Sequence, residues 1–83
     1  MFNCSNSSEA IKLFCEENNL TPYKFAKYTN ISITYAYNII NGKMKNPSAW
    51  IIDRINRGIE SNARLIEIER NRGKNNEHIK RRI

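Results

Sequence analysis

The side chains best suited to chemistry in this chain are cations gathered in its middle, in an interval that contains no acid. Lys24, Lys27, Lys43 and Lys45 lie within residues 18–52, where no Asp or Glu occurs. The whole chain of 83 residues has a formal net charge of +6 and a pI near 9.6. A positive field focused on one segment attracts polyanions such as nucleic acid, although ribosomal and membrane-surface proteins share a basic balance. The chemistry indicated is electrostatic binding.

The residues that catalysis or metal binding would need are few and scattered. Cys4 stands in a polar leader and Cys15 on an apolar helical stripe, which suggests neither a disulfide framework nor a metal site. We therefore assign Cys15 a structural role. The only histidine, His78, is expected to be solvated rather than a ligand. No nucleophile, base and orienting acid fall together, so we expect no enzymatic activity, no cofactor and no metal.

Length and hydropathy predict one small domain. With 83 residues, 40% of them hydrophobic, the chain can build one modest core that pairing with a second copy would complete. No apolar run approaches the roughly 20 residues of a membrane span, and no basic leader precedes an apolar segment at the start. We expect a soluble protein of the cytoplasm that does not associate with membranes.

Apolar spacing and capping residues predict an all-α fold, a compact bundle of about five helices. Threonine, serine and asparagine cap exposed amides, proline fits the first helical position, and glycine or asparagine adopts the positive φ that ends a helix. The expected boundaries are Ser7 or Ser8 to Asn18-Asn19, Thr21-Pro22 to Tyr28, Ser32 to Gly42, Pro47-Ser48 to Gly58, and Ser61 to Gly73. Asn30 is expected to carry a positive φ in the turn between the second and third helices.

Each helix contributes one apolar face to the expected core. The predicted members are Ala10, Ile11, Phe14, Cys15, Leu20, Phe25, Ala26, Ala36, Ile39, Ile40, Trp50, Ile51, Ile52 and Ile55. The third helix would then direct outward Ile33, Thr34, Tyr35, Tyr37, Asn38 and Asn41. The fifth helix carries apolar surface beyond what one chain covers, and we expect a homodimer interface there, formed by Ala63, Leu65, Ile66 and Ile68.

The predicted domain comprises residues 1–72, with the functional motif at 21–42 and the dimer helix at 61–72. Residues 73–83 are expected to form a basic, flexible tail. Cations are concentrated from Arg70 onward, where only Glu77 opposes them.

The segment from Leu20 to Pro47 resembles the helix-turn-helix of phage Cro and repressor proteins and of related xenobiotic-response-element regulators. The matching positions are Leu20, Phe25-Ala26, Asn30 at the usual glycine, Ile39, Asn41-Gly42-Lys43, Pro47 and Gly58-Ile59. The resemblance spans roughly residues 10–65 without an obvious insertion. It implies a lambda-repressor-like DNA-binding domain whose third helix lies in the major groove of double-stranded DNA.

The resemblance also implies a role for individual residues. Family members read bases with the first, second and sixth residues of the recognition helix, here Ile33, Thr34 and Asn38, and Tyr35 stands beside them. Ile33 suits a thymine methyl group and Asn38 an adenine edge, which predicts an operator rich in A and T. Phosphate contacts are expected from Asn41, Lys43, Lys45, Ser48 and the backbone amides of that loop, with Lys24 and Lys27 as further candidates.

Three features depart from the family pattern. Pro22 replaces a glutamine that often binds phosphate, and Ala36 is smaller than the usual branched core residue. Neither Arg nor Gln opens the recognition helix, so strong reading of guanine is not expected.

We expect a sequence-specific transcriptional regulator, a homodimeric repressor of phage or mobile-element origin that binds a palindromic operator, with its own operon as a target. Two alternatives remain open. An antitoxin or phage-encoded inhibitor would use the fifth helix and tail to bind a partner protein. An RNA-binding or architectural protein would rely on the basic segment 70–82. A further alternative without any binding function is an amphipathic helical domain whose lysines only maintain solubility and whose helix-turn-helix geometry is a packing motif.

Overall fold

Five α-helices make up the described part of the chain, and no strand occurs among these residues. The computed structural model describes Phe2 and residues 7–82, with side chains as far as Arg72. In chain order the helices are α1 (Ser7–Glu17), α2 (Pro22–Thr29), α3 (Ile33–Ile40), α4 (Ala49–Ser61) and α5 (Ala63–Arg82). The predicted all-α fold is confirmed.

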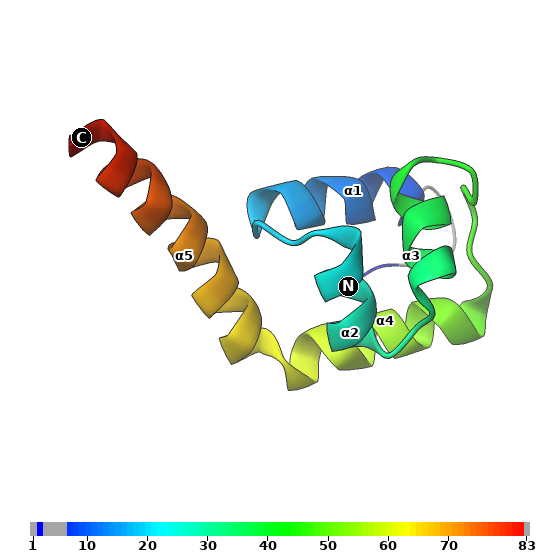
Figure 1. The fold of residues 1–83 in the computed structure, drawn as a ribbon. Helices are drawn as coiled ribbons and strands as arrows, with labels where there is room; N and C mark the ends of the chain where they lie inside the picture. The colour runs from blue at the N-terminus through cyan, green and yellow to red at the C-terminus, as the bar shows by residue number, and fades with distance from the viewer. Residues whose placement is uncertain (1, 3–6, 83) are drawn as a thin grey trace.

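The first four helices form a body from which α5 projects. Figure 1 shows α1 and α4 on opposite sides of this body, with α2 and α3 between them. α2 packs against both α3 and α4, and α1 packs against α3. The hydroxyl of Ser8 donates to the carbonyl of Ile39 and thereby ties the start of α1 to α3. Because α5 runs away from the end of α4, the longest dimension of the molecule reaches 45 Å.

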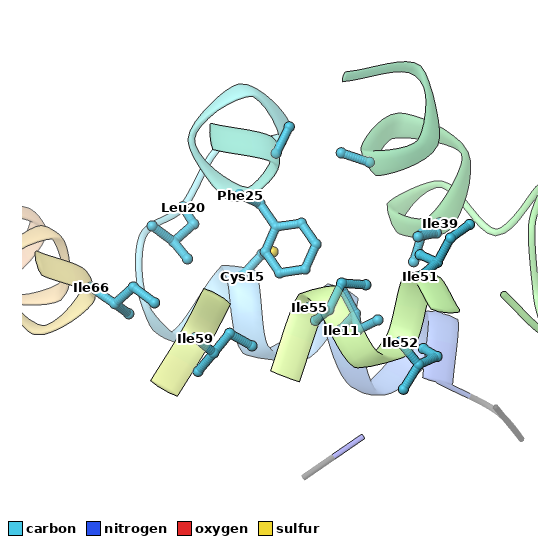
Figure 2. Packing of buried hydrophobic residues seen from close by; sticks show 12 residues of the cluster. Ile11, Cys15, Leu20, Phe25, Ile39, Ile51, Ile52, Ile55, Ile59 and Ile66 are labelled. Atoms are coloured by element: carbon cyan, nitrogen blue, oxygen red, sulfur yellow. The ribbon is translucent and has the colours of Figure 1, made fainter. Parts of the chain in front are cut away.

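The core lies where α1, α2, α3 and α4 meet (Figure 2). Ile11, Phe25, Ile39 and Ile55 are its largest fully buried apolar side chains. Burying one such side chain contributes about 1.5 to 3 kcal/mol relative to leaving it exposed. The buried members are Ile11, Cys15, Leu20, Phe25, Ala26, Ala36, Ile39, Ile51, Ile52, Ile55, Ile59 and Ile66. Most of the predicted core is therefore confirmed, with Phe14 and Ile40 packed partly buried at its edge.

Two predicted core residues, Ala10 and Trp50, are exposed. An α-helix turns by about 100° per residue, so only positions three or four residues apart share a face. In α4 the buried residues are Ile51, Ile52, Ile55 and Ile59, and Trp50 lies off the stripe that they form. The prediction grouped Trp50 with its apolar neighbours in the sequence and overlooked its rotational position.

Two asparagines with left-handed backbone shape the turns on either side of α2. Asn19 has φ 57° and Asn30 has φ 58°, a region that asparagine tolerates better than most residues. The side chains of Thr21 and Ser32 cap α2 and α3, each accepting a backbone N–H at 3.1 Å. These predicted features are confirmed.

Gly58 lies inside α4, which continues to Ser61, so the predicted helix end at Gly58 and the predicted cap at Ser61 are wrong. The glycine is needed because α4 crosses the end of α2 at this point. A Cβ on Gly58 would lie 2.4 Å from the carbonyl oxygen of Tyr28 and 2.5 Å from Cα of Thr29. Asn62 ends α4, and its side-chain amide donates to the carbonyls of Gly58 and Tyr28.

α5 is a single helix across the position where the ordered part of the chain was expected to end. Its backbone remains helical through Gly73 and ends at Arg82. The predicted boundary between residues 1–72 and a flexible tail at 73–83 is therefore not a helix boundary. Glycine weakens a helix by about 1 kcal/mol relative to alanine but does not exclude it. The side chain of His78 lies outside the described part.

Cys15 is a buried, unpaired core residue, in keeping with its predicted structural role. Burial, followed by the charge of Glu16, raises the pKa of the Cys15 thiol from 9.0 to about 12. Such a thiol stays protonated at neutral pH and reacts slowly, because the thiolate is the nucleophile. Cys4 lies outside the described residues.

Candidate nucleic-acid interface

One face of α3 carries its polar side chains, and the opposite face lies in the core. Ala36 and Ile39 are fully buried on the inward face. The exposed or partly buried outward set consists of Ile33, Thr34, Tyr37, Asn38 and Asn41. Three of the four residues predicted to contact bases therefore share one outward face, which we call the polar face of α3.

The two tyrosines of α3 differ in position. Tyr35, a predicted base contact, packs at the edge of this face against Trp50 of α4, with ring centroids 5.9 Å apart and planes at 85°. Tyr37 was expected to point outward but was not among the predicted base contacts. It is exposed one helical turn after Thr34, so the helical period alone could have assigned it to the polar face.

In the loop after α3, several backbone N–H groups already donate hydrogen bonds within the chain. The N–H of Lys43 donates to Oδ1 of Asn41 at 3.2 Å, and those of Gly42 and Met44 donate to carbonyls of α3 at 3.2 and 2.8 Å. The prediction that these loop amides bind phosphate is therefore wrong for residues 42–44. The loop instead presents the side-chain nitrogen of Asn41 and the exposed cations Lys43 and Lys45.

The start of α4 offers the amide donors that the loop lacks. Ser48 is the N-cap, but its side chain makes no capping hydrogen bond. Its carbonyl accepts the N–H groups of Ile51 and Ile52, both at 3.1 Å. The preceding amides of Ala49 and Trp50 belong to the first turn, whose N–H groups have no carbonyl partner within the helix. This terminus, with the Ser48 hydroxyl, is suited to an anion.

Lys24 and Lys27, the two further phosphate candidates, lie in different surroundings. Lys24 forms an ion pair with Glu69 of α5 at 2.8 Å, with its side chain 34% exposed. It therefore belongs to the contact between α2 and α5, and we remove it from the phosphate set. Lys27 is exposed and lines a shallow hollow with Asn30 and Ile33, next to the start of α3.

Glu69 is the centre of a polar cluster that the sequence analysis missed, here called the Glu69 clamp. Its carboxylate is almost fully buried and accepts from Lys24 Nζ at 2.8 Å, the Tyr28 hydroxyl at 3.0 Å and Arg72 at 3.3 Å. The hydrogen bond from Lys24, followed by the one from Tyr28 and the charge of Arg72, holds the pKa of Glu69 below its usual value despite burial. Burial and the neighbouring Glu69 raise the pKa of Tyr28. The clamp links α5 to α2.

The surface around the polar face of α3 is basic, because residues 18–52 include no acid. The first acid of α4, Asp53, is paired with Arg57 at 3.1 Å. At the other end, Glu9 of α1 lines a hollow together with Asn41 and Lys45. Of the two loop lysines, Lys45 therefore shares a hollow with the acidic Glu9, and Lys43 does not line that hollow.

The four residues predicted to form a dimer interface do not share one environment. Leu65 and Ile68 are 46% and 47% exposed, and Ala63 is also exposed. Ile66 is only 5% exposed because it packs onto the core of its own chain, so its assignment to the interface is wrong. It forms the floor of a groove between α1, α4 and α5, lined also by Phe14, Ile59, Glu67 and Arg70.

The arrangement suits noncovalent binding of an anion-rich surface, with hydrogen-bond donors on α3 flanked by a lysine loop and a helix N-terminus. Within the described residues, no group of three or more His, Cys, Asp or Glu side chains is placed to hold a metal ion. None of the helices in that part of the chain combines the length and apolar character needed to cross a membrane. Comparison with models of protein families, with curated proteins and with solved structures found no match for this chain.

Proposed function

We propose that the chain is a sequence-specific regulator that binds double-stranded DNA through α3 in the major groove. In this proposal α2 and α3 act as a helix-turn-helix, and Asn38, Thr34 and Ile33 contact base edges. The protein would bind a palindromic operator as a homodimer, with its recognition helices about 34 Å apart and α5 as the dimer element. Covering a promoter, its own included, would make it a repressor of the kind that phages and mobile elements carry.

The observation that carries the proposal is the polar face of α3 followed directly by two groups suited to phosphate. Lys43 lies on the loop that follows α3, and the first-turn amides of α4 follow that loop. Phosphate contacts next to a helix orient it on the duplex, and the side chains of that helix can then read base edges. No acid along residues 18–52 opposes this approach.

Selection of bound sequences from a pool of random duplex DNA tests the proposal directly. A two-fold symmetric motif, with A and T at the steps read by α3, is the expected result. Such a motif would support both base reading and dimer formation. A selected pool without any enriched motif would overturn the proposal.

The first variant for this site is Asn38→Ala. We expect it to weaken binding to the selected operator by about 1 to 3 kcal/mol and to leave affinity for random duplex nearly unchanged. Alanine retains the Asn38 backbone carbonyl that accepts the N–H of Met44, so the loop after α3 should stay in place. Fluorescence anisotropy with both duplexes gives the measurement. Equal losses on the two duplexes would exclude Asn38 from base reading.

The second variant, Lys43→Ala, separates phosphate binding from base reading. Affinity should fall about equally for operator and random duplex, and the slope of log affinity against log salt should flatten by roughly one unit. Arg64→Ala is the matched control, because it removes an exposed cation from the start of α5, away from the polar face of α3. A salt slope that stays unchanged in Lys43→Ala would remove this lysine from the phosphate set.

A second candidate function, binding of a partner protein, is supported by α5. Leu65 and Ile68 remain about half exposed in a single chain. They are three residues apart and therefore share one face of α5, which is not the face that lines the groove with Ile66. Exposed apolar side chains grouped in this way mark protein interfaces. Sedimentation equilibrium separates the two cases: our proposal requires self-association of the free protein or on the operator, whereas an antitoxin or inhibitor would leave this face open for a different chain.

A further inference from the structure

Trp50 stands half exposed beside the polar face of α3, held by two neighbours. Its side chain is 52% exposed. Tyr35 of α3 packs against it edge to face, and the Arg54 guanidinium lies over its ring at 5.5 Å from the centroid. Arg54 in turn donates to the carbonyl of Asn30 at 3.0 Å. We call Tyr35, Trp50 and Arg54 the Trp50 platform.

The platform is built from separate segments, so its geometry is fixed before any ligand arrives. Asn30 comes from the turn before α3, Tyr35 from the first half of α3, and Trp50 and Arg54 from adjacent positions on one face of α4. The exposed indole of Trp50 leaves apolar surface in contact with water, and a partner that covered this surface would stabilise the complex. An indole held rigidly in this way loses little conformational entropy when a partner covers it.

The surroundings of the platform favour a sugar–phosphate partner over an apolar protein face. The Arg54 cation lies on the ring itself. The Ser48 hydroxyl and the amides of Ala49 and Trp50, which have no carbonyl partner within the helix, lie within the first turn of α4. The nearest acid in the sequence, Asp53, is paired with Arg57. An apolar partner would leave these donors buried without acceptors, which costs free energy, whereas a phosphate oxygen would accept from them.

We propose that the Trp50 platform binds the backbone of duplex DNA beside the major groove that α3 enters. The indole of Trp50 packs against a deoxyribose, and the first-turn amides of α4 with the Ser48 hydroxyl bind the adjacent phosphate. This contact rests on the proposed function. It adds Trp50, which the sequence analysis placed in the core, to the phosphate contact already expected at Ser48. Because every nucleotide carries the same sugar and phosphate, the contact strengthens binding without reading sequence.

Trp50 is the only tryptophan of the chain, so tryptophan emission reports on the platform alone. The full-length protein is titrated with duplex DNA while tryptophan emission and the anisotropy of labelled DNA are recorded together. We expect both signals to change with the same midpoint. DNA binding by anisotropy with constant tryptophan emission would overturn the inference. Emission that changes with protein concentration in the absence of DNA would assign Trp50 to a protein interface and would also overturn it.

Two substitutions give an independent test. Trp50→Ala should weaken binding to operator and random duplex alike, by roughly five- to thirtyfold, the range of a strong interface contact. Trp50→Phe retains a ring and should recover most of the affinity. Leu13→Ala is the matched control, since Leu13 of α1 is also 52% exposed and should leave affinity unchanged. Unchanged affinity in Trp50→Ala, or a loss confined to the operator, would contradict a backbone contact.

The outcomes also separate this inference from the proposed function. If no duplex shifts the anisotropy of the wild-type mixture, DNA binding itself fails. If duplex binds with a selected motif but neither tryptophan emission nor Trp50→Ala responds, only the platform is excluded. If Trp50→Ala does not fold, the emission titration of the wild-type protein and the affinity of Trp50→Phe still test whether Trp50 contacts DNA.

Discussion

Replacing Gly58 with alanine is expected to lower the free energy of unfolding by about 2 kcal/mol or more, although alanine is the better helix former by about 1 kcal/mol. The new Cβ would lie 2.4 Å from the Tyr28 carbonyl oxygen and 2.5 Å from Thr29 Cα. Both are backbone atoms, so no side-chain rotation can relieve the overlap, and α2 and α4 must move apart. Chemical denaturation followed by circular dichroism measures the loss.

The displacement should also reach the proposed interface. Tyr28 and Thr29 directly precede Asn30, whose left-handed backbone determines the direction of α3. The Tyr28 carbonyl also accepts from the side chain of Asn62 at 2.9 Å, a hydrogen bond that the separation would break. We therefore expect Gly58→Ala to weaken DNA binding beyond the fraction that is unfolded.

Gly73→Ala is the control for the glycine argument. Gly73 also lies in helical backbone, within α5, and alanine there should maintain or slightly raise stability. If Gly58→Ala proved as stable as Gly73→Ala, the close approach of α2 and α4 at Gly58 would be refuted.

The second large effect is expected from Glu69→Ala, which should lower the free energy of unfolding by about 2 kcal/mol. Three side chains from two helices donate to this buried carboxylate: Lys24 and Tyr28 of α2 and Arg72 of α5. Its removal leaves the Tyr28 hydroxyl and two cations without their acceptor, and α5 loses its polar attachment to α2. Glu67→Ala, an exposed acid two residues earlier on α5, should change stability by no more than about 0.5 kcal/mol.

The pH dependence of the clamp follows from the direction of the Glu69 shift. Its folded pKa lies below the ordinary value of 4.5, chiefly because of the Lys24 hydrogen bond, so the unfolded chain binds the proton more tightly. The stabilisation is therefore complete above pH 4.5 and is lost as the pH falls through the lower folded pKa. Glu69→Gln cannot titrate there.

Thermal melts of the wild type and of Glu69→Gln, recorded from neutral to acidic pH, isolate this contribution. The difference in melting temperature between the two proteins should be largest at neutral pH and should shrink below about pH 4.5. A difference that stays constant through the acidic range would show that the Glu69 charge does not stabilise the fold.

The local features of the fold could be predicted because few consecutive residues determine them. The cap at Ser32, the positive φ of Asn30 and the burial of Ala36 and Ile39 follow from capping chemistry, backbone sterics and helical period. The polar face of α3 follows from the same period. Trp50 is different, since the spacing of the apolar residues in α4 already placed it off the buried stripe, yet it was predicted as a core residue.

Contacts between segments that are far apart in the chain could not be predicted from the sequence. Lys24 and Glu69 are 45 positions apart, and no local pattern marks either as the partner of the other. Gly58 was taken as a helix end because glycine commonly terminates helices, yet its role depends on the backbone of Tyr28 against it. Ile66 was assigned to a dimer although α5 turns it onto the core of its own chain.

The sequence by itself determined the helical class, the caps, the turn between α2 and α3, and a basic segment without acids, because each depends on residue type and short-range spacing. Only the tertiary structure decided which cations remain at the surface, which amides are already engaged, and that Trp50 lies beside α3. The physical reason is that a charge, an amide or a ring can bind a partner only where it is not already paired with, or packed against, another segment of the chain. That depends on which segments meet in the folded chain.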